Sequence, residues 1–388
     1  MSMRSGVQTS NNQATEGRAV RSVAPIIHEL EIDKAPLTVI MTKAAGRLVP
    51  SGNKKVEWFE DALPAQFDVL SANLLVGDAV MEVTNFAYFA KGMLVQINRK
   101  EIVRVTATPT TTTVAIARAV GEEVAAAATA ADQLFIIGDS SEEGTNVSPI
   151  LMTLKDNPYN YMEITKTDIG WTGTAAASDV YGKSDPDQDR AKAIIKHARE
   201  LEKKYIVGQR SFTAVGPVDG KEHRTMRGVL RYIVTNTGPM SGEMTQEEFD
   251  NHLRKSFRYG SNKKLLIASG TVINVINAFA REKVAPATFN PTYGLKLSKY
   301  VTPFGDLDIA YSPLLENDSL DDLAGLAGLG IVLDIANLEV NHLPNRYMMH
   351  MMNTQAAGLD GEQEEILSEC CISVPQEKMH SYFDGVTS

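Results

Sequence analysis

The residues of this chain that come nearest to a chemical motif are Gly182, Lys183 and Ser184, which match the end of a phosphate-binding loop. That motif also needs a glycine five residues earlier, because the glycines let backbone N–H groups approach the phosphates. Position 177 is alanine, and Asp185-Pro186 interrupts the direct passage from loop to helix. We therefore expect no nucleotide site here.

A second glycine pattern lies at Gly325, Gly328 and Gly330. Its spacing is GxxGxG, whereas the dinucleotide fingerprint is GxGxxG and opens a helix. Here the glycines precede a segment that is typical of a strand. The pattern predicts a flexible connector, with no role in binding a cofactor.

The seven histidines form no metal or catalytic motif. HExxH and GxSxG are absent, and no Cys/His cluster has metal-ligand spacing. We expect His342 and His350 to be packing or surface residues, and the methionines of 348–352 to fill irregular core or subunit contacts. The sequence thus predicts no catalytic, cofactor-binding or metal-binding residue. It cannot pair carboxylates across the fold, so a two-carboxylate hydrolase site remains open.

Composition bounds the class of protein. The 388 residues are 43% hydrophobic and carry a formal net charge of −10, so no basic field exists for reading DNA sequence. No apolar run approaches the roughly 20 residues that cross a bilayer, so we expect no membrane partner. The only two cysteines, Cys370 and Cys371, are adjacent and would point to opposite faces of a strand, which disfavours a disulfide and fits a reducing compartment.

The N-terminal half contains segments whose sequences are typical of extended chain and of β-strands. Residues 1–20 are polar and cannot order themselves by burial, so we expect neighbouring subunits to hold them, with the chain's own body as the alternative. Residues 37–71 are irregular and predict a long extended arm or hairpin. Residues 77–144 alternate apolar and polar types between turns such as Asn98-Arg99, and predict a small inserted barrel or sandwich. Within it, 124–131 (VAAAATAA) fits a helix or a loop equally.

The strongest helix signal begins at Asp185-Pro186 and ends before Gly208. Asp185 is a suitable N-cap and Pro186 suits the first helical position. Its expected apolar face is made of Ala191, Ile194, Ile195, Ala198, Leu201 and Tyr205.

Later segments alternate between helix and strand patterns. Thr245 and Glu248 form a capping-box sequence for a second helix, and the apolar run 263–269 predicts a buried strand that leads into a third helix. A returning strand is expected earlier, at 158–174, before the long helix. From Leu295 onward strand patterns dominate, with a hairpin turning at Pro303–Asp306 and strands within 330–343, 346–353 and 364–374. The fold class expected is α+β.

The order of these elements, together with several phrases, resembles a known family. The phrases are PYNYMEITKTDIGWTGTA (158–175), YVTPFGDLDIAYSPLL (300–315) and EEILSECCISVPQEKMHSYFDG (364–385). The chain is similar over about residues 30–388 to the major capsid proteins of tailed bacteriophages, whose fold is the Hong Kong 97 (HK97) type. The resemblance implies an N-terminal arm (1–35), an extended loop (36–76 and 145–180) with an inserted β domain (77–144), a spine helix with peripheral domain (181–224), an axial domain (225–290), and peripheral and axial strands to the C-terminus (291–388).

The resemblance implies a structural function without enzymatic activity. Copies of the chain would assemble into pentamers and hexamers of an icosahedral shell that encloses double-stranded DNA without reading its sequence. Residues 1–75 and the β insertion would make most contacts between capsomers, and 225–290 would face the ring centre. Further partners would be a separate scaffolding protein, a portal and a decoration protein. Assembly would take place in the bacterial cytoplasm and the product would be the virion head, with no residue here matching the Lys–Asn cross-link of some members.

Three other interpretations remain at this point. An encapsulin, which is a cellular nanocompartment with a similar fold, would differ in shell size and would lack genomic DNA. A soluble hydrolase would show a deep pocket lined by carboxylates with perturbed pKa values. A tail or decoration protein would bind to shells without forming them.

Overall fold

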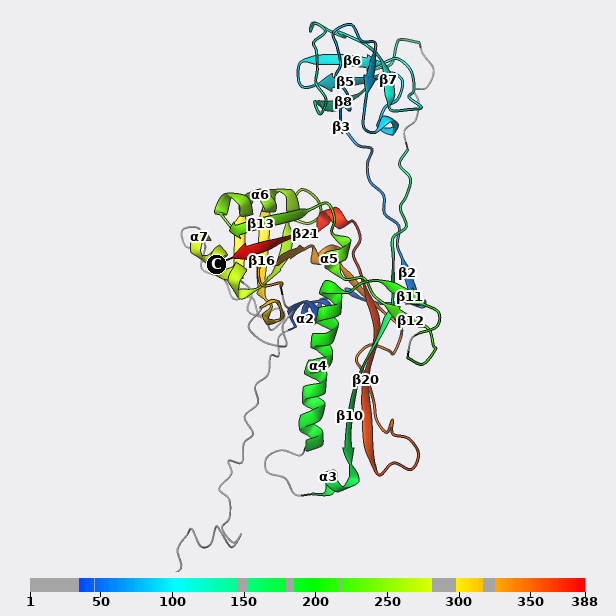
Figure 1. Cartoon of the computed structure of the whole chain (residues 1–388), viewed down its shortest axis with the longest axis vertical. Coiled ribbons are helices and arrows are strands. Elements are labelled where there is room, and N and C mark those ends of the chain that lie inside the picture. Colours follow the sequence, from blue (N-terminus) through cyan, green and yellow to red (C-terminus); the bar gives the residue numbers. More distant parts are fainter. Residues whose placement is uncertain are drawn as a thin grey trace, which may run out of the picture. The chain divides into compact units, whose positions relative to one another are not determined.

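The protein contains two compact units. The computed structural model describes residues 35–44, 46–144, 152–178, 185–216, 218–280, 298–316 and 325–387. One unit combines the chain up to Trp58 with the chain from Tyr159 onward, and the other is Phe59–Pro158 (Figure 1). Helices and strands occur together in the first unit, as the predicted α+β class requires. The polar segment 1–20 and the phosphate-loop-like residues 182–184 lie outside the described residues.

The Phe59–Pro158 unit is built on one six-stranded antiparallel sheet in the order β3-β8-β5-β6-β7-β4. A further bridge between Leu70 and Val83 joins the two end strands, so the sheet closes on itself. Inside it lies a separate core that includes Phe89, Val95 and Val103. The elements are β3 (Phe67–Val69), β4 (Val80–Glu82), η1 (Phe86–Tyr88), β5 (Met93–Ile97), β6 (Glu101–Val105), β7 (Thr113–Ala117) and β8 (Gln133–Asp139).

Local sequence explains the hairpin at the centre of this sheet. Asn98 and Arg99 have φ values of 44° and 58°, and the Lys100 N–H donates to the Ile97 carbonyl at 2.9 Å. Two consecutive positive φ values give the tight turn whose twist matches a β-hairpin. The segment 124–131 forms no helix and is a loop that bridges to Leu74, which resolves the alternative that the sequence left open.

In the larger unit, one sheet is dominated by two long antiparallel strands. β10 and β20 pair from Glu163–Cys370 to Thr172–Gly361, and β20 also pairs with β18 and β19. α3 (Gly173–Ala177) follows β10 directly. The strands are β1 (Leu48–Pro50), β10 (Glu163–Thr172), β18 (Glu339–His342), β19 (Met349–Met351) and β20 (Gly361–Ser373).

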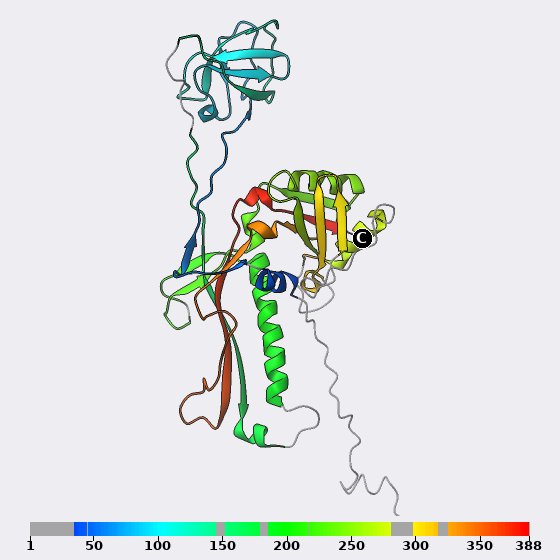
Figure 2. The same ribbon diagram turned by 180° about the vertical axis from the view of Figure 1, so that it is seen from behind.

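The longest helix, α4 (Asp185–Val207), lies along β10 and β20 in both ribbon views (Figures 1 and 2). Its range agrees with the predicted one. Its buried face agrees only in part: Leu201 and Tyr205 are buried as predicted, but Ala191 and Ile194 are exposed. The buried residues are Ala193, His197, Leu201, Glu202, Tyr205 and Ile206. Two polar residues belong to this set because hydrogen-bonding partners on other elements meet them, which a pattern of apolar residues cannot reveal.

A short helix, α2 (Pro36–Lys43), occupies a segment that the sequence predicts as extended, so that expectation is wrong. Its N-cap residue Ala35 supplies no side-chain cap. Instead the buried carboxylate of Glu202 on α4 accepts hydrogen bonds from the N–H groups of Leu37 and Thr38 at 3.0 and 2.6 Å. The signal that stabilises this helix therefore lies more than 160 residues away in the chain.

The second sheet of the larger unit has six strands in the order β13-β21-β17-β14-β16-β15. β14 is parallel to β16 and antiparallel to β17, and both faces of β14 are buried. The strands are β13 (Thr237–Glu243), β14 (Lys263–Ala268), β15 (Ser298–Thr302), β16 (Gly305–Tyr311), β17 (Gly330–Leu333) and β21 (Ser381–Thr387), and the helices of this region are α6 (Gln246–Ser256) and α7 (Gly270–Ala280).

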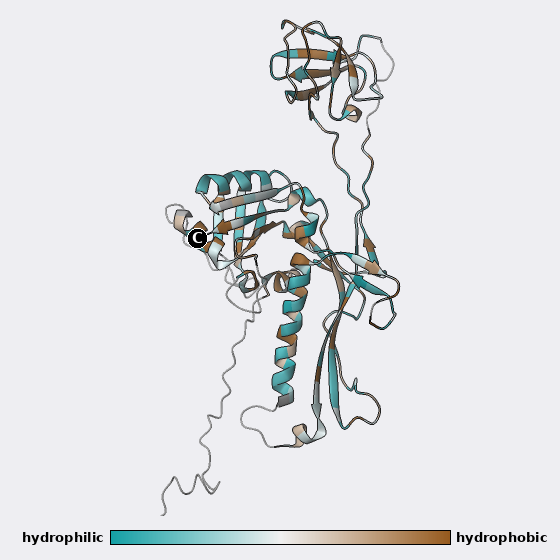
Figure 3. Ribbon diagram, viewed as in Figure 1, coloured by the Kyte–Doolittle hydropathy of each residue, from teal (hydrophilic) through white to brown (hydrophobic). Residues whose placement is uncertain are grey.

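Helix α6 begins as predicted. Thr245 and Glu248 form a complete capping box, in which each side chain accepts from the other residue's backbone N–H. Phe249 and Leu253 bury one face of the helix against the second sheet, while the rest of the helix is largely hydrophilic (Figure 3). This amphipathic pattern was sufficient to locate the helix from sequence.

Two of the three glycines that suggested a flexible connector, Gly328 and Gly330, are tightly packed, which corrects that expectation for them, whereas Gly325 has open space around it. Gly330 lies in β17, and a Cβ there would fall 2.2 Å from the ring of the buried Phe383. A Cβ on Gly328 would fall 2.6 Å from the backbone of Val386. These glycines are required because β21 passes directly over them.

Smaller elements complete the larger unit. The cysteines Cys370 and Cys371 are free and buried on β20. None of the described helices is long and apolar enough to cross a membrane. The remaining elements are β2 (Lys55–Glu57) paired with β9 (Tyr159–Tyr161), β11 (Ser211–Thr213) paired with β12 (His223–Thr225), α5 (Val229–Tyr232), η3 (Pro313–Leu315), η4 (Ile335–Asn337) and η5 (Glu377–Met379).

Candidate assembly surfaces

Two extended segments of the Phe59–Pro158 unit, one around Leu63 and the other around Leu154, carry apolar side chains that are exposed to solvent. They run antiparallel and are joined by the Glu60–Asp156 bridge, whose two N–H···O bonds are both 2.9 Å. Leu63 and Leu154 are 92% and 95% exposed. Large apolar groups favour burial by about 25 cal/mol per Å². Side chains this exposed contribute nothing to the stability of the single chain, and they mark a surface that another molecule can cover.

The outer face of the closed sheet is also partly apolar. Phe67 on β3 is the direct cross-strand partner of Phe135 on β8, and both rings are about half exposed. Ile137 follows two residues later on the same face. Alternation along β8 explains this, because Leu134 and Ile136 point into the core and leave the intervening side chains outside.

An ion-pair cluster links α4 to the part of the long β10–β20 pair that contains Glu364. Arg190 donates to Glu364 through Nε and Nη2, at 2.8 and 2.6 Å, and His350 Nε2 lies 2.8 Å from the same carboxylate. The Arg190 hydrogen bonds hold the pKa of Glu364 below its ordinary value. Arg190 also lies over the ring of Trp171 at 5.1 Å. The cluster fixes the start of α4 against the sheet.

A second cluster is centred on the buried carboxylate of Glu369, farther along β20. Arg224 Nη2 donates to it at 2.8 Å and Arg346 Nε at 2.6 Å. Arg224 lies in β12, and Arg346 lies in the turn that precedes β19. One carboxylate therefore connects a short strand and a turn to the long strand.

The buried titratable groups of α4 and the second sheet have structural partners. His197 lies between the hydroxyls of Thr167 and Ser368, at 2.9 and 2.8 Å, and burial lowers its pKa to about 4. Lys264 donates to three backbone carbonyls, and burial lowers its pKa to about 8. Both groups are enclosed by their own fold, so neither is placed to reach a substrate.

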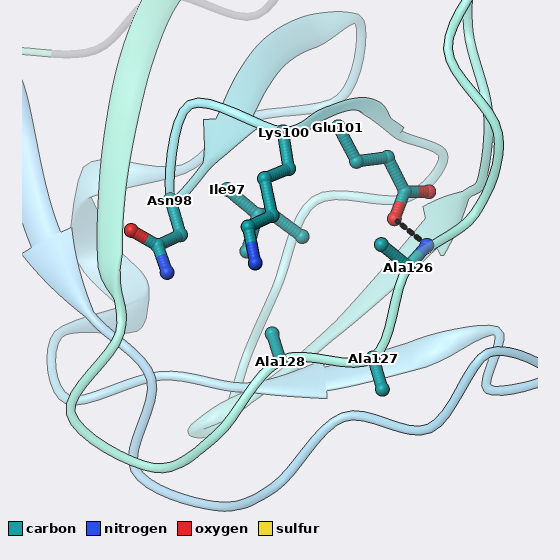
Figure 4. Close-up of a pocket in the computed structure, with 7 residues that line it drawn as sticks. All are labelled: Ile97, Asn98, Lys100, Glu101, Ala126, Ala127 and Ala128. Carbon is teal, nitrogen blue, oxygen red and sulfur yellow. Dashed lines mark hydrogen bonds between the residues drawn. The ribbon is translucent and has the colours of Figure 1, made fainter.

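One small surface hollow lies in the small unit. It is lined by Ile97, Asn98, Lys100, Glu101 and Ala126 to Ala128 (Figure 4) and has a volume of about 10 Å³, close to that of one water. The carboxylate of Glu101 that points toward it is engaged by Arg118 and by the N–H of Ala126. A ligand site of the usual several hundred Å³ needs far more space.

The histidines and methionines that the sequence singled out have no joint role in chemistry. His342 bonds to a backbone carbonyl and contacts the Tyr347 ring at a tilted angle, while His350 belongs to the Glu364 cluster. Met348 packs against the core, and Met349 and Met352 are partly exposed. Over the described ranges, no group of three or more His, Cys, Asp or Glu side chains could hold a metal ion.

The sequence of the chain matches the model of one protein family, described as SU10 major capsid protein, over residues 5–387. The chain belongs to this family. Among curated proteins, none matches the sequence. The exposed apolar segments are a feature expected of a capsid protein, which works through contacts with other copies.

The fold is similar to that of a solved phage capsid structure, and further capsid and shell structures match less closely. The capsid protein of cyanophage A-1(L) has a TM-score of 0.52 at 10% identity, and the match covers 98% of this chain and 100% of that one. The capsid of a native GTA particle matches with a TM-score of 0.49 at 9% identity, over 98% and 100% of the two chains. The SrpI encapsulin of Synechococcus elongatus PCC 7942 matches with a TM-score of 0.41 at 8% identity, over 60% and 76%.

These comparisons favour a phage capsid shell protein over the encapsulin alternative, because the family match names a major capsid protein over nearly the whole sequence. Sequence reasoning missed the ion-pair clusters at Glu364 and Glu369. The acidic residues in the sequence of β20 did not predict them, because their arginine partners come from segments 23 to 174 residues away.

Proposed function

We propose that this capsid protein assembles into pentamers and hexamers of an icosahedral shell that encloses the double-stranded DNA of a tailed phage. The observation that carries the proposal is the pair of apolar segments around Leu63 and Leu154, which are almost fully exposed in the single chain. Closed symmetry repeats each contact many times, so modest individual contacts yield a durable shell. Copies of this chain are the partner that such a repeated surface fits best.

We assign the parts of the chain by likeness to the family fold. Helix α4 corresponds to the spine helix within 181–224, residues 36–76 and 145–180 to the extended loop, and 77–144 to its β insertion. Residues 225–290 correspond to the axial domain and 291–388 to the peripheral and axial strands. In this assignment the exposed connectors reach neighbouring subunits, and the 1–35 arm does the same.

The remaining partners follow from the same proposal. A separate scaffolding protein, a portal and a decoration protein would meet the shell, and the head would assemble in the host cytoplasm. The formal net charge of −10 fits a container whose DNA is held without sequence recognition and slides freely during packaging and release.

Removal of the two most exposed apolar side chains tests the proposal. In Leu63→Ser/Leu154→Ser the single chain should keep its thermal stability, because both side chains contribute little to its core. Shell formation should fall steeply, as seen by electron microscopy and sedimentation of the purified full-length protein. Leu359→Ser, at a half-exposed leucine outside these segments, is the matched control. Shells of normal yield and shape from the double variant would contradict the proposal.

The arm is tested separately. A chain that lacks residues 1–20 should fail to form normal closed shells if the arm joins neighbouring subunits. Normal shells from the truncated chain would refute that role for the arm while leaving the rest of the proposal intact.

A further inference from the structure

Three arginines form a compact positive cluster beside α5. Arg210 Nη1 donates to the Tyr159 carbonyl at 2.6 Å and lies over the Tyr159 ring at 3.9 Å. Arg227 lies over the Tyr232 ring at 4.4 Å and donates to the Arg231 carbonyl at 3.1 Å. These contacts fix the position of the first two guanidinium groups. We call Arg210, Arg227 and Arg231 the arginine triad.

The triad has no carboxylate partner among the residues that the structure describes. Burial and the positive charges of Arg210 and Arg231 together lower the pKa of Arg227, so the three cations repel one another. The side chain of Arg231 is exposed. Unpaired like charges held this close are costly within the single chain, and a negative group that approached them would relieve the repulsion.

The cations around the triad are, in contrast, already paired. Lys54 bonds Glu222 at 2.7 Å, Lys204 bonds Glu163 at 2.7 Å, and Arg224 bonds Glu369 at 2.8 Å. Binding to a nucleic-acid backbone needs a continuous track of free cations and free aromatic faces. Here a further cation over the Tyr159 ring, Lys55, is paired with Glu57, and the Tyr159 and Tyr232 rings are covered by the chain's own cations. The site fits one or two carboxylates better than a polyanion.

The small unit of the same protein offers such carboxylates. Residues 59–158 contain 13 Asp and Glu against six Lys and Arg, a net charge of −7 out of −10 for the whole chain. Most of its acidic groups are engaged, as Glu101 is by Arg118. Glu122 and Glu123 are adjacent, exposed and free of any ion pair with the described residues, and Val124 beside them is 78% exposed.

We infer that the arginine triad of one copy binds the Glu122–Glu123 loop of a second copy. The guanidinium groups would hold the two carboxylates, and Val124 would contact the half-buried Tyr159 ring at its edge. The inference rests on the proposed function, because it needs copies of the chain to meet in a shell. It adds the residues on both sides of one contact and makes that contact dependent on salt.

A charge-swap series on the full-length protein tests the inference. Arg231→Glu should raise the protein concentration at half-assembly about tenfold, the change expected for loss of roughly one interfacial ion pair. Glu122→Arg should weaken assembly similarly, and Arg231→Glu/Glu122→Arg should restore part of it, because the exchanged pair attracts again while Arg210 and Arg227 still face Glu123. Arg254→Glu on α6, an exposed arginine outside the triad, makes the same change in charge and should leave assembly near wild type.

The outcomes separate this contact from the general function. Sedimentation velocity across a range of NaCl concentrations measures assembly, and thermal unfolding shows that each variant is folded. The contact is refuted if Arg231→Glu and Arg254→Glu assemble alike, or if the combined variant is as weak as its parents while folded. Those results leave the shell function standing. A wild-type protein that forms no shells would instead overturn the proposed function.

Discussion

Replacement of Glu202 should lower the free energy of unfolding of the larger unit. Glu202 is fully buried on α4 and accepts from Leu37 N–H, Thr38 N–H and the Thr38 hydroxyl at 3.0, 2.6 and 2.8 Å. Glu202→Ala removes the only cap of α2 that the described structure shows and leaves two backbone donors without acceptors. A lost cap costs about 1 kcal/mol and each unsatisfied buried donor about 1–3 kcal/mol.

Removal of the buried carboxylate also removes its desolvation cost, so we expect the free energy of unfolding to fall by a net amount of about 2–4 kcal/mol. At roughly 2 °C per kcal/mol for a large domain, the unfolding temperature should fall by about 4–8 °C. Glu200→Ala, on the same helix but partly exposed, is the control and should change stability by less than about 0.5 kcal/mol. The assay is denaturant and thermal unfolding of unassembled full-length protein, followed by circular dichroism.

The pH dependence gives a second readout at the same site. Burial raises the pKa of Glu202 above its ordinary 4.5, so the folded state keeps a proton that the unfolded state releases. The stability contributed by Glu202 therefore falls as pH rises above about 4.5. The stability difference between wild type and Glu202→Gln should narrow over that range. Equal stabilities of Glu202→Ala and Glu200→Ala would refute the capping argument.

Three further predictions concern other parts of the fold. Gly330→Ala should destabilise the larger unit by about 1–3 kcal/mol in denaturant unfolding, because its Cβ meets Phe383, whereas Gly52→Ala, with open space around it, should be nearly neutral. Arg99→Gly should stabilise the small unit by about 0.5–1 kcal/mol in the same assay, since the residue has a φ of 58°. Glu364→Gln should lose stability at neutral pH. The pKa of Glu364 is depressed in the folded state, so the stability difference between wild type and Glu364→Gln should shrink as pH falls below the ordinary 4.5. A stability difference that is constant with pH would contradict the ion-pair role.

The elements whose signals are local were predictable from sequence. The capping box at Thr245 and Glu248, the start of α4 at Asp185 and the strand 263–268 all carry their own start, stop or periodicity. The hairpin of β15 and β16 turns within the predicted Pro303–Asp306 segment. Local propensity and tertiary structure agree at these places.

Elements whose determinants are distant were not predictable. Helix α2 depends on a carboxylate 165 residues away, and the buried positions of α4 include His197 because Thr167 and Ser368 meet it. Glycines 328 and 330 look like a connector until β21 is placed against them. The arginine triad escaped notice for the same reason, since its members are ordinary charged residues until the fold gathers them and leaves them without carboxylate partners in the described structure.

The central claim is that copies of this chain are one another's main partners. Electron cryomicroscopy of the purified full-length protein, alone and with a candidate scaffolding protein, tests it most directly. We predict closed icosahedral shells built from five-fold and six-fold capsomers. A protein that stays monomeric under every assembly condition would contradict the account.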